Sequence, residues 1–268
     1  MKVIALGMGM QSTALYLMSS MRLFERADVA IFSDPMSEHP DTYKLVEWLL
    51  KWSKECADAI PIHIVKKDLY NDIINPINKT KNGNNLYAAI PAFIKKDNGE
   101  VGIIMRQCTG DYKIKPVVKQ IRNIYGLKAR QKMPKTEMWL GITIDEAQRM
   151  KSSKNSRITN RFPFLELMMS RDDCMNFMKD NGFPIPPKSA CVFCPYRPDR
   201  DWIKLKKENG KAWKKIIEID YKIRQRKDIS LKNDVFLHRS CKPIDKVVFK
   251  NEDQVDMFGN ECEGHCGL

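Results

Sequence analysis

Short apolar segments alternate with longer amphipathic ones along the first third of the chain. The apolar segments are four or five residues long, which is typical of buried strands, and the amphipathic ones have helical spacing. Strand–helix alternation of this kind predicts an α/β fold, a Rossmann-like, doubly wound and mostly parallel sheet. We expect strands at 2–6, 29–32 and 62–65, and helices at 12–22 and from Pro40 to 56.

The pattern becomes more polar and more basic after this first third. Ser170 with Asp173 forms a capping box that starts a helix ending near Gly182. We expect residues 1–165 to form a nucleotide-binding domain, and 166–268 a Cys-rich, basic helical C-terminal extension packed on it. Other expected elements are a helix at 116–124, a strand at 137–142, a mobile active-site loop at 144–161 and a basic helix at 202–227.

The chain has 268 residues and a net charge of +13. This charge predicts an anionic partner, a nucleic acid or a phosphorylated small molecule, unless it reflects only a lysine-rich composition. No apolar run approaches the ~20 residues that span a bilayer, and the start lacks a signal-peptide pattern. We therefore expect a cytoplasmic protein without a membrane partner, whose eight cysteines serve as metal ligands, a redox centre or inert core residues.

A glycine-containing turn joins the first expected strand to the first expected helix. Gly7 and Gly9 allow the backbone to approach a ligand closely, and the helix that opens at Ser12 offers free N–H groups to a phosphate or sulfate. Close packing alone is the alternative explanation for two such glycines. Asp34 follows the second strand, where an acid commonly reaches a ribose or a base edge.

The two turns together resemble one known family. The chain has, in order, a strand, the motif G-x-G-x-Q-S, a second strand, Asp34 and then Pro-Asp-Thr-Tyr at 40–43. This order is similar to that of the phosphoadenosine-phosphosulfate reductase family. That family belongs to the PP-loop, adenine nucleotide alpha-hydrolase-like superfamily. Gln11 stands where the PP-loop has an acid, which disfavours plain ATP pyrophosphatase chemistry. The resemblance implies ATP or another adenine nucleotide, with or without magnesium, held at its phosphates by Gly7, Gly9, Gln11 and Ser12 and at its adenosine by Asp34.

Cysteines at two distant places of the chain carry a second resemblance. Cys191 and Cys194 form a C-x-x-C after a proline-rich stretch, a spacing that suits one metal ion or one cluster. Cys108, Lys113 and Pro116 resemble the Cys-Cys-x-x-[RK]-K-x-x-P segment of iron–sulfur adenylylsulfate reductases, with Thr109 in place of the second cysteine. The resemblance implies a 4Fe-4S cluster with Lys113 near it, and structural zinc is the alternative.

The fourth ligand of such a cluster stays open. Cys241, Cys262 or Cys266 could supply it. Alternatively, one iron could have no protein ligand, as in PP-loop enzymes that deliver sulfur to nucleobases. The ending Cys266-Gly-Leu resembles the mobile tail that carries the attacking thiolate in the reductases, but His265 replaces its glutamate. An exposed, inactive tail is the alternative to a catalytic Cys266.

Basic residues after the strand at 137–142 are candidates for an anion site. The reductases carry arginine directly after the glycine that corresponds to Gly141, and this chain has Thr143 there, which disfavours phosphoadenosine phosphosulfate as substrate. Arg149 and Arg157 could still hold phosphate oxygens, although a solvated charge is the alternative for each. The basic helix could track a nucleic-acid backbone, or simply be a solvated lysine face.

These observations lead to three hypotheses. The first is an adenine-nucleotide-binding, iron–sulfur enzyme that transfers sulfur to, or modifies, a nucleic acid or nucleobase. The second is a sulfonucleotide reductase with Cys266 as nucleophile. The third is a zinc-containing nucleic-acid-binding module without turnover. A homo-oligomer or an operon-encoded partner is compatible with each.

Overall fold

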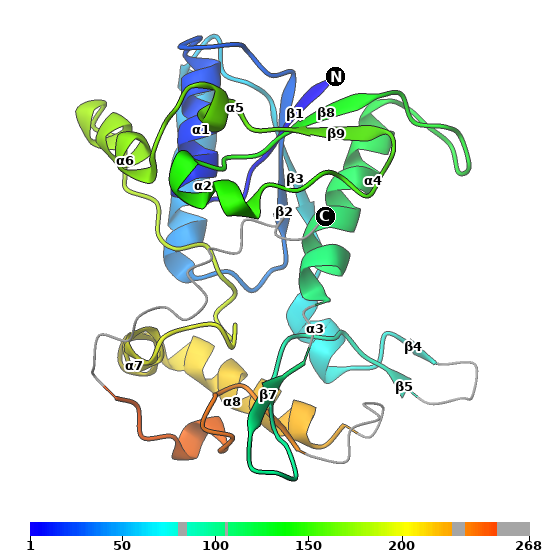
Figure 1. Cartoon of the computed structure of the whole chain (residues 1–268), viewed down its shortest axis with the longest axis vertical. Helices are drawn as coiled ribbons and strands as arrows, with labels where there is room; N and C mark the ends of the chain where they lie inside the picture. The colour runs from blue at the N-terminus through cyan, green and yellow to red at the C-terminus, as the bar shows by residue number, and fades with distance from the viewer. Residues whose placement is uncertain (80–84, 105–106, 227–233, 251–268) are drawn as a thin grey trace.

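A five-stranded parallel sheet forms the upper part of the molecule (Figure 1). The structure is a computed structural model, and it describes residues 1–79, 85–104, 107–226 and 234–250. The strand order β3-β2-β1-β8-β9 is Rossmann-like, which confirms the predicted fold class. The strands are β1 (Lys2–Ala5), β2 (Val29–Asp34), β3 (Ile62–Lys66), β8 (Thr136–Trp139) and β9 (Ile158–Arg161).

Helices cover both faces of this sheet because successive strand side chains point to opposite faces. Ile4 and Trp139 belong to the core beneath the helices on one face, whereas Val3 and Met138 belong to the core beneath the helix on the other. Both cores are apolar, as expected for a parallel sheet buried on its two sides. The first face carries α1 (Met10–Ser20), α2 (Pro40–Glu55), α5 (Pro163–Glu166) and α6 (Arg171–Asp180), and the second carries α4 (Lys115–Ile124) (Figure 1).

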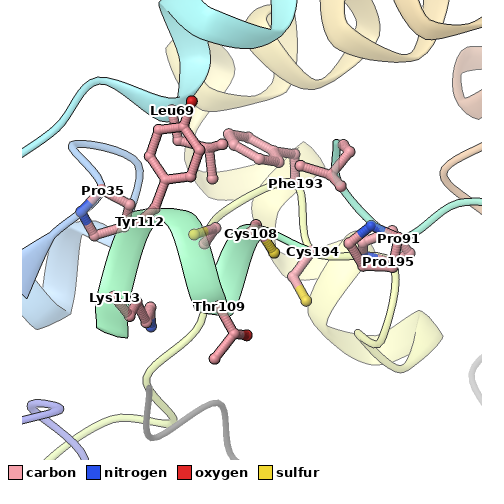
Figure 2. Close-up of a pocket in the computed structure, with 12 residues that line it drawn as sticks. Pro35, Leu69, Pro91, Cys108, Thr109, Tyr112, Lys113, Phe193, Cys194 and Pro195 are labelled. Carbon is pink, nitrogen blue, oxygen red and sulfur yellow. The ribbon is translucent and has the colours of Figure 1, made fainter. Parts of the chain in front are cut away.

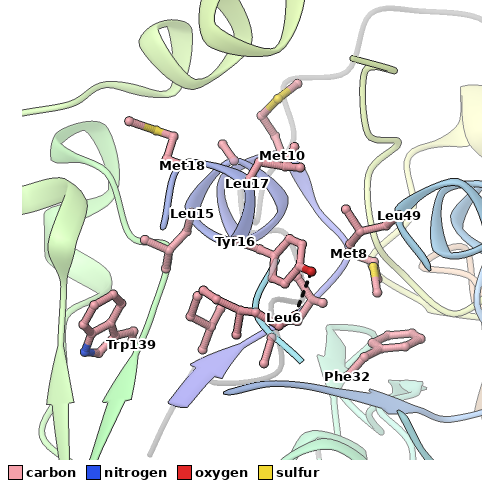
Figure 3. Close-up of a cluster of buried hydrophobic side chains, with 14 of the residues drawn as sticks. Leu6, Met8, Met10, Leu15, Tyr16, Leu17, Met18, Phe32, Leu49 and Trp139 are labelled. Atoms are coloured by element: carbon pink, nitrogen blue, oxygen red, sulfur yellow. Dashed lines mark hydrogen bonds between the residues drawn. The ribbon is translucent and has the colours of Figure 1, made fainter. Parts of the chain in front are cut away.

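Helix α1 is buried along its whole length, and Figure 3 shows its apolar side chains among those of the sheet and α2. Its polar residues are satisfied by neighbouring backbone. The Tyr16 hydroxyl donates to the Ile60 carbonyl at 2.9 Å, and Ser20 Oγ accepts from the Ile60 amide at 3.2 Å. These two bonds hold Ile60, which precedes β3, against α1. The predicted capping box of α6 is confirmed, since Ser170 Oγ accepts from the Asp173 amide at 3.1 Å.

A second core lies below the sheet and holds the C-terminal helices. Asp220, buried in it, accepts the backbone N–H groups of Leu237 at 3.0 Å and Ile244 at 3.1 Å, and burial raises the pKa of this carboxyl. Its elements are α3 (Leu69–Ile74), α7 (Asp199–Glu208), α8 (Gly210–Arg224), a 3-10 turn η3 (Ile244–Lys246) and an antiparallel sheet of β10 (Val235–Phe236), β6 (Phe93–Lys95) and β7 (Val101–Ile103) (Figure 1).

The second core takes residues from both sides of the predicted domain boundary at 165. Phe93 of β6 pairs with Phe236 of β10, and α3 packs on α8. The boundary itself stays a prediction. The polar stretch 78–85 is typical of a surface loop, and its described residues include β4 (Asn78–Lys79), which pairs antiparallel with β5 (Asn85–Leu86).

Two predicted elements were wrong. The segment 144–161 is not one loop, because it contains a 3-10 helix η2 (Ile144–Arg149) and the edge strand β9. Strand β9 has a single strongly apolar residue, Ile158, so its sequence lacks the pattern that predicts a strand.

The basic helix predicted at 202–227 is two helices. Asn209 ends α7 and caps α8 by accepting from the Ala212 amide at 3.0 Å, as asparagine commonly does at a helix start.

No helix among the described residues is long and apolar enough to cross a bilayer.

Candidate functional site at the carboxyl edge of the sheet

The loops that follow β1 and β2 lie at the same edge of the sheet, because parallel strands end on the same side. The glycine turn at 7–9 leads from β1 into α1, and the acid loop at 34–39 leads from β2 into α2. The structure thus brings the two predicted nucleotide segments to neighbouring positions.

The glycine turn is closed by a side chain of α1. Ser12 Oγ accepts from the Gly7 amide at 3.1 Å and from the Gly9 amide at 3.3 Å, so both N–H groups face the helix start. Gly9 is the N-cap of α1, and Met8 between the glycines adopts φ of 58°. An anion bound here would share these N–H groups with the serine hydroxyl, at the positive end of the helix dipole.

Two residues outside the predicted set, Gly141 and Glu146, pack against this helix start. Gly141 lies so close that a Cβ would stand 2.9 Å from the Gln11 carbonyl carbon and the Ser12 amide nitrogen. Glu146 Oε2 accepts from Gln11 Nε2 at 3.3 Å and pairs with the Arg149 guanidinium. Sequence reasoning identified Gln11 and Arg149. For Glu146 it offered only the positioning of a metal or a base and not this contact with Gln11, because only the fold brings η2 to α1.

Asp34 is held by hydrogen bonds at the end of β2. Its Oδ1 accepts from the Met36 amide at 2.7 Å and from the Tyr43 hydroxyl at 2.9 Å. Burial raises the pKa of Asp34, and it also raises the pKa of Tyr43, whose phenolate would face the carboxylate. The Pro-Asp-Thr-Tyr segment therefore orients the acid through Tyr43.

Three of the predicted metal ligands line a single pocket (Figure 2). Cys108 comes from the helical turn that precedes α4, and Cys191 and Cys194 come from the loop before α7. Lys113 also lines this pocket, together with apolar walls that include Leu69 and Phe193. Two segments distant in the sequence thus meet beside the sheet, at its junction with the second core.

A π-helical turn, η1 (Gly110–Ile114), fixes the Cys108 side of the pocket. The Ser33 hydroxyl donates to the Tyr112 carbonyl at 2.7 Å, which joins η1 to the end of β2. The Tyr112 hydroxyl donates to Asp72 Oδ2 at 2.6 Å, and Lys67 lies over the Tyr112 ring at 3.9 Å. A π-turn inside a longer helix is frequent at functional sites.

Backbone and arginine contacts fix the side of the pocket that carries Cys191. Glu38 and Cys191 form an antiparallel bridge, and the Val192 amide donates to the Ser37 carbonyl at 2.8 Å. Arg197 donates to the Cys191 carbonyl from Nε at 3.2 Å and to the Ala190 carbonyl from Nη2 at 2.8 Å. The acid loop and the C-x-x-C loop therefore form one continuous structure.

A buried ion pair lies next to the cysteines. Lys113 Nζ stands 3.0 Å from Glu38 Oε1, although neither carboxylate oxygen of Glu38 accepts an aligned hydrogen bond. The Glu38 side chain is fully buried, and that of Lys113 is 10% exposed. Burial and the Glu38 charge raise the pKa of the Cys191 thiol well above its usual range, and Lys113 partly opposes this.

The donor set is soft sulfur, which suits zinc or iron–sulfur chemistry. Within the described ranges, no group of three or more His, Cys, Asp or Glu side chains is placed to hold a single metal ion. Zn–S bonds of about 2.3 Å would put the thiolates of one ion roughly 4 Å apart. An iron–sulfur cluster is bound through several irons, so its thiolates stand further apart, and the three thiols that line this pocket are the donors that such a cluster uses.

Two predicted site residues lie away from these groups. Cys241 follows β10 and does not line the cysteine pocket. Burial raises the pKa of its thiol, and the charge of Lys95 on β6 opposes this. Arg157 directly precedes β9, which places it at the amino edge of the sheet, opposite to the glycine turn. Cys262 and Cys266 lie outside the described residues.

Comparison of the chain with known protein families, with curated proteins and with solved structures finds no match.

Proposed function

We propose that this chain is an adenine-nucleotide-binding, iron–sulfur enzyme similar to the phosphoadenosine-phosphosulfate reductases. One observation carries the proposal: Cys108, Cys191 and Cys194, from two distant segments, line one pocket beside a Rossmann-like sheet. The acid loop after β2 pairs directly with the loop that carries Cys191. A nucleotide at this edge would therefore lie near the cysteines.

Each group in the proposed site has a defined task. Gly7, Gly9 and Ser12 bind phosphate oxygens at the start of α1, and Asp34 contacts the adenosine. Cys108, Cys191 and Cys194 hold a 4Fe-4S cluster, which when bound supplies an iron able to carry sulfur or electrons. Lys113 adds a positive charge at the pocket wall, and Glu38 holds it there.

Sulfur transfer, or nucleotide-activated modification, of a nucleic acid or nucleobase is the reaction class that we favour. Three cysteines for a four-iron cluster would leave one iron without a protein thiolate, a position where sulfide can bind. A basic chain suits a nucleic-acid acceptor. The described residues give no separate support to a reductase mechanism through Cys266, so that reaction is an alternative outcome.

Anaerobic purification followed by iron, sulfide and zinc analysis tests the proposal. We expect a brown protein with iron and inorganic sulfide, and a colourless Cys191→Ser variant. Cys56→Ser is the matched control, since Cys56 is the C-cap of α2 and does not line the pocket. A colourless wild-type protein with stoichiometric zinc would contradict the proposal and favour a nucleic-acid-binding module.

A further inference from the structure

Exposed lysines gather on one side of α8. Their spacing of three, four and seven residues places them on one face of a helix with about 3.6 residues per turn. We call this group the lysine face: Lys211, Lys214, Lys215 and Lys222. Among the residues of α8, Glu218 is the one acid on this side, and its carboxylate accepts from the Tyr70 hydroxyl of α3.

Three of these lysines have no acidic partner within the part of the chain that the structure describes: Lys211, Lys214 and Lys222. Lys44 on α2, by contrast, holds its Nζ 2.9 Å from Asp41. Like charges three or four residues apart on a helix repel each other. The lysine face thus carries uncompensated positive charge, which favours an anionic partner.

The position of Lys211 adds to this repulsion. It lies in the first turn of α8, which contains no acidic residue, so its charge is set against the positive end of the helix dipole. Helix α7 has the opposite and favourable order, with acids in its first turn and lysines in its last. The stability of α8 therefore gives no reason for these lysines, whereas a bound anion removes the repulsion among them.

The lysine face is long enough to follow a stretch of nucleic-acid backbone. A helix rises about 1.5 Å per residue, so Lys211 and Lys222 stand about 17 Å apart along α8. One strand of a duplex advances about 3.4 Å per phosphate, so this length matches roughly five phosphates. Tyr221 is 49% exposed beside this row, and an exposed ring can stack on an unpaired base. An extended row of this kind suits a polyanion rather than one small anion.

Contacts between α8 and α3 place the lysine face next to a wall of the cysteine pocket. Lys215 Nζ lies 4.9 Å from the centroid of the Tyr70 ring, and α3 packs on α8 (Figure 1). Leu69, which precedes Tyr70 in α3, lines the cysteine pocket (Figure 2). A nucleic acid on the lysine face therefore lies against the same short helix that contributes to the pocket wall.

We infer that the lysine face of α8 binds the phosphate backbone of a nucleic acid. This inference rests on the proposed function, because it assigns a surface to the nucleic-acid acceptor proposed there. Its consequence is an affinity that falls steeply as salt increases, since each contact between a lysine and a phosphate releases counterions.

Fluorescence anisotropy with labelled DNA and RNA oligonucleotides, each single-stranded and as a duplex, tests the inference. The test variant combines Lys211→Gln, Lys214→Gln and Lys222→Gln. We expect wild type to bind at least one oligonucleotide, and the variant to bind it about tenfold more weakly or worse. The slope of log affinity against log salt should become shallower by about 2–3, since each phosphate contact contributes roughly 0.7–0.9. The melting temperature of the variant should not fall, because the removed charges have no acidic partner.

A second triple variant controls for net charge. Lys128→Gln, Lys132→Gln and Lys135→Gln remove exposed lysines from the loop before β8, at the amino edge of the sheet. This variant has the same net charge as the test variant. We expect its affinity to stay within about twofold of wild type, because salt screens charges that lie more than a Debye length from the bound strand. Equal losses in the two variants would show attraction by overall charge alone and overturn the inference.

The remaining outcomes separate this inference from the proposed function. A test variant that binds as tightly as wild type would overturn the inference and leave the proposed function intact. An iron-containing wild-type protein that binds no oligonucleotide at low salt would overturn the inference and the nucleic-acid acceptor, but not the cluster. Binding to phosphatidylserine vesicles in place of oligonucleotides would assign the lysine face to a membrane surface and overturn the inference as well. A colourless protein whose test variant alone loses oligonucleotide binding would contradict the cluster and support the inference.

Discussion

Asp34 combines a cost in stability with a position suited to binding. It is 4% exposed, and its Oδ1 accepts from both the Met36 amide and the Tyr43 hydroxyl. Burial is the main cause of its raised pKa, and the charge of Glu38 adds to it, while Lys66 opposes it. A buried carboxyl group whose pKa is raised in this way is typical of functional sites.

The pKa of Asp34 leads to a prediction about stability and pH. Because the folded-state pKa is raised, this group contributes stability that is fully present below the unfolded pKa and lost as pH rises through the folded pKa. Asparagine at position 34 keeps the oxygen that accepts both bonds and carries no charge. We therefore expect Asp34→Asn to have a higher free energy of unfolding than wild type at neutral pH, with the gain vanishing near pH 3.

Urea unfolding across this pH range measures the effect. Asp97→Asn is the control, because it makes the same substitution at an exposed aspartate. A lower stability of Asp34→Asn at neutral pH would show that the negative charge itself stabilises the fold. A difference that does not change with pH would show that this charge has no effect on stability, and either result would contradict the prediction.

Residue-level prediction from sequence succeeded where local pattern carries the information. The glycine turn and Asp34 follow apolar strands, and this placed them at the carboxyl edge of the sheet. Glu38 and Glu146 gave no such signal, because the burial of both and the pairing of Glu38 with Lys113 arise only from the tertiary structure. Their roles, like those of the cysteines, stay predictions until tested.

At the scale of elements, the contact between β8 and α1 sets the position of the glycine turn. Gly141, two residues beyond β8, packs on the backbone of Gln11 and Ser12. A side chain here would displace the first turn of α1, since the clashing atoms are backbone and cannot rotate away.

We therefore expect Gly141→Ala to lower the free energy of unfolding by about 1–3 kcal/mol, as overpacking commonly does. Chemical denaturation measures this change, and ATP affinity should fall as well because the helix start moves. Gly210→Ala is the matched control. A Cβ at Gly210 would meet nothing within 4 Å, so the free energy of unfolding of this variant should stay within about 0.5 kcal/mol of wild type. Equal effects at both positions would contradict the close contact.

Elements with strong periodicity were predicted close to their observed bounds. The four predicted strands and the helices on the sheet are long enough, or apolar enough, for the spacing of their apolar residues to identify each element. Strand β9 has one strongly apolar residue, and the break at Asn209-Gly210 is a capping signal inside a continuous basic stretch. Neither feature changes the average hydrophobicity of the surrounding segment, so the pattern of apolar and polar residues does not reveal it.

At the scale of the whole molecule, the cysteine pocket lies where two cores meet. Cys108 and Cys191 pack against the second core, whereas the acid loop that pairs with Cys191 extends from the sheet. Sequence could not predict that α3 and β6 join the C-terminal helices, because the contact of α3 with α8 and the pairing of β6 with β10 are long-range. The meeting of the cysteine segments was anticipated through the family resemblance, not through local pattern.

The arrangement of the cysteines is the central claim, and iron content in single cysteine variants tests it most directly. Cys108→Ser, Cys194→Ser and Cys241→Ser would each be purified anaerobically and analysed for iron and sulfide beside wild type. We predict that Cys108→Ser and Cys194→Ser lose most of both, since the two residues line one pocket, and that Cys241→Ser keeps them. Full iron in Cys108→Ser, or loss in Cys241→Ser equal to that in Cys194→Ser, would contradict the account.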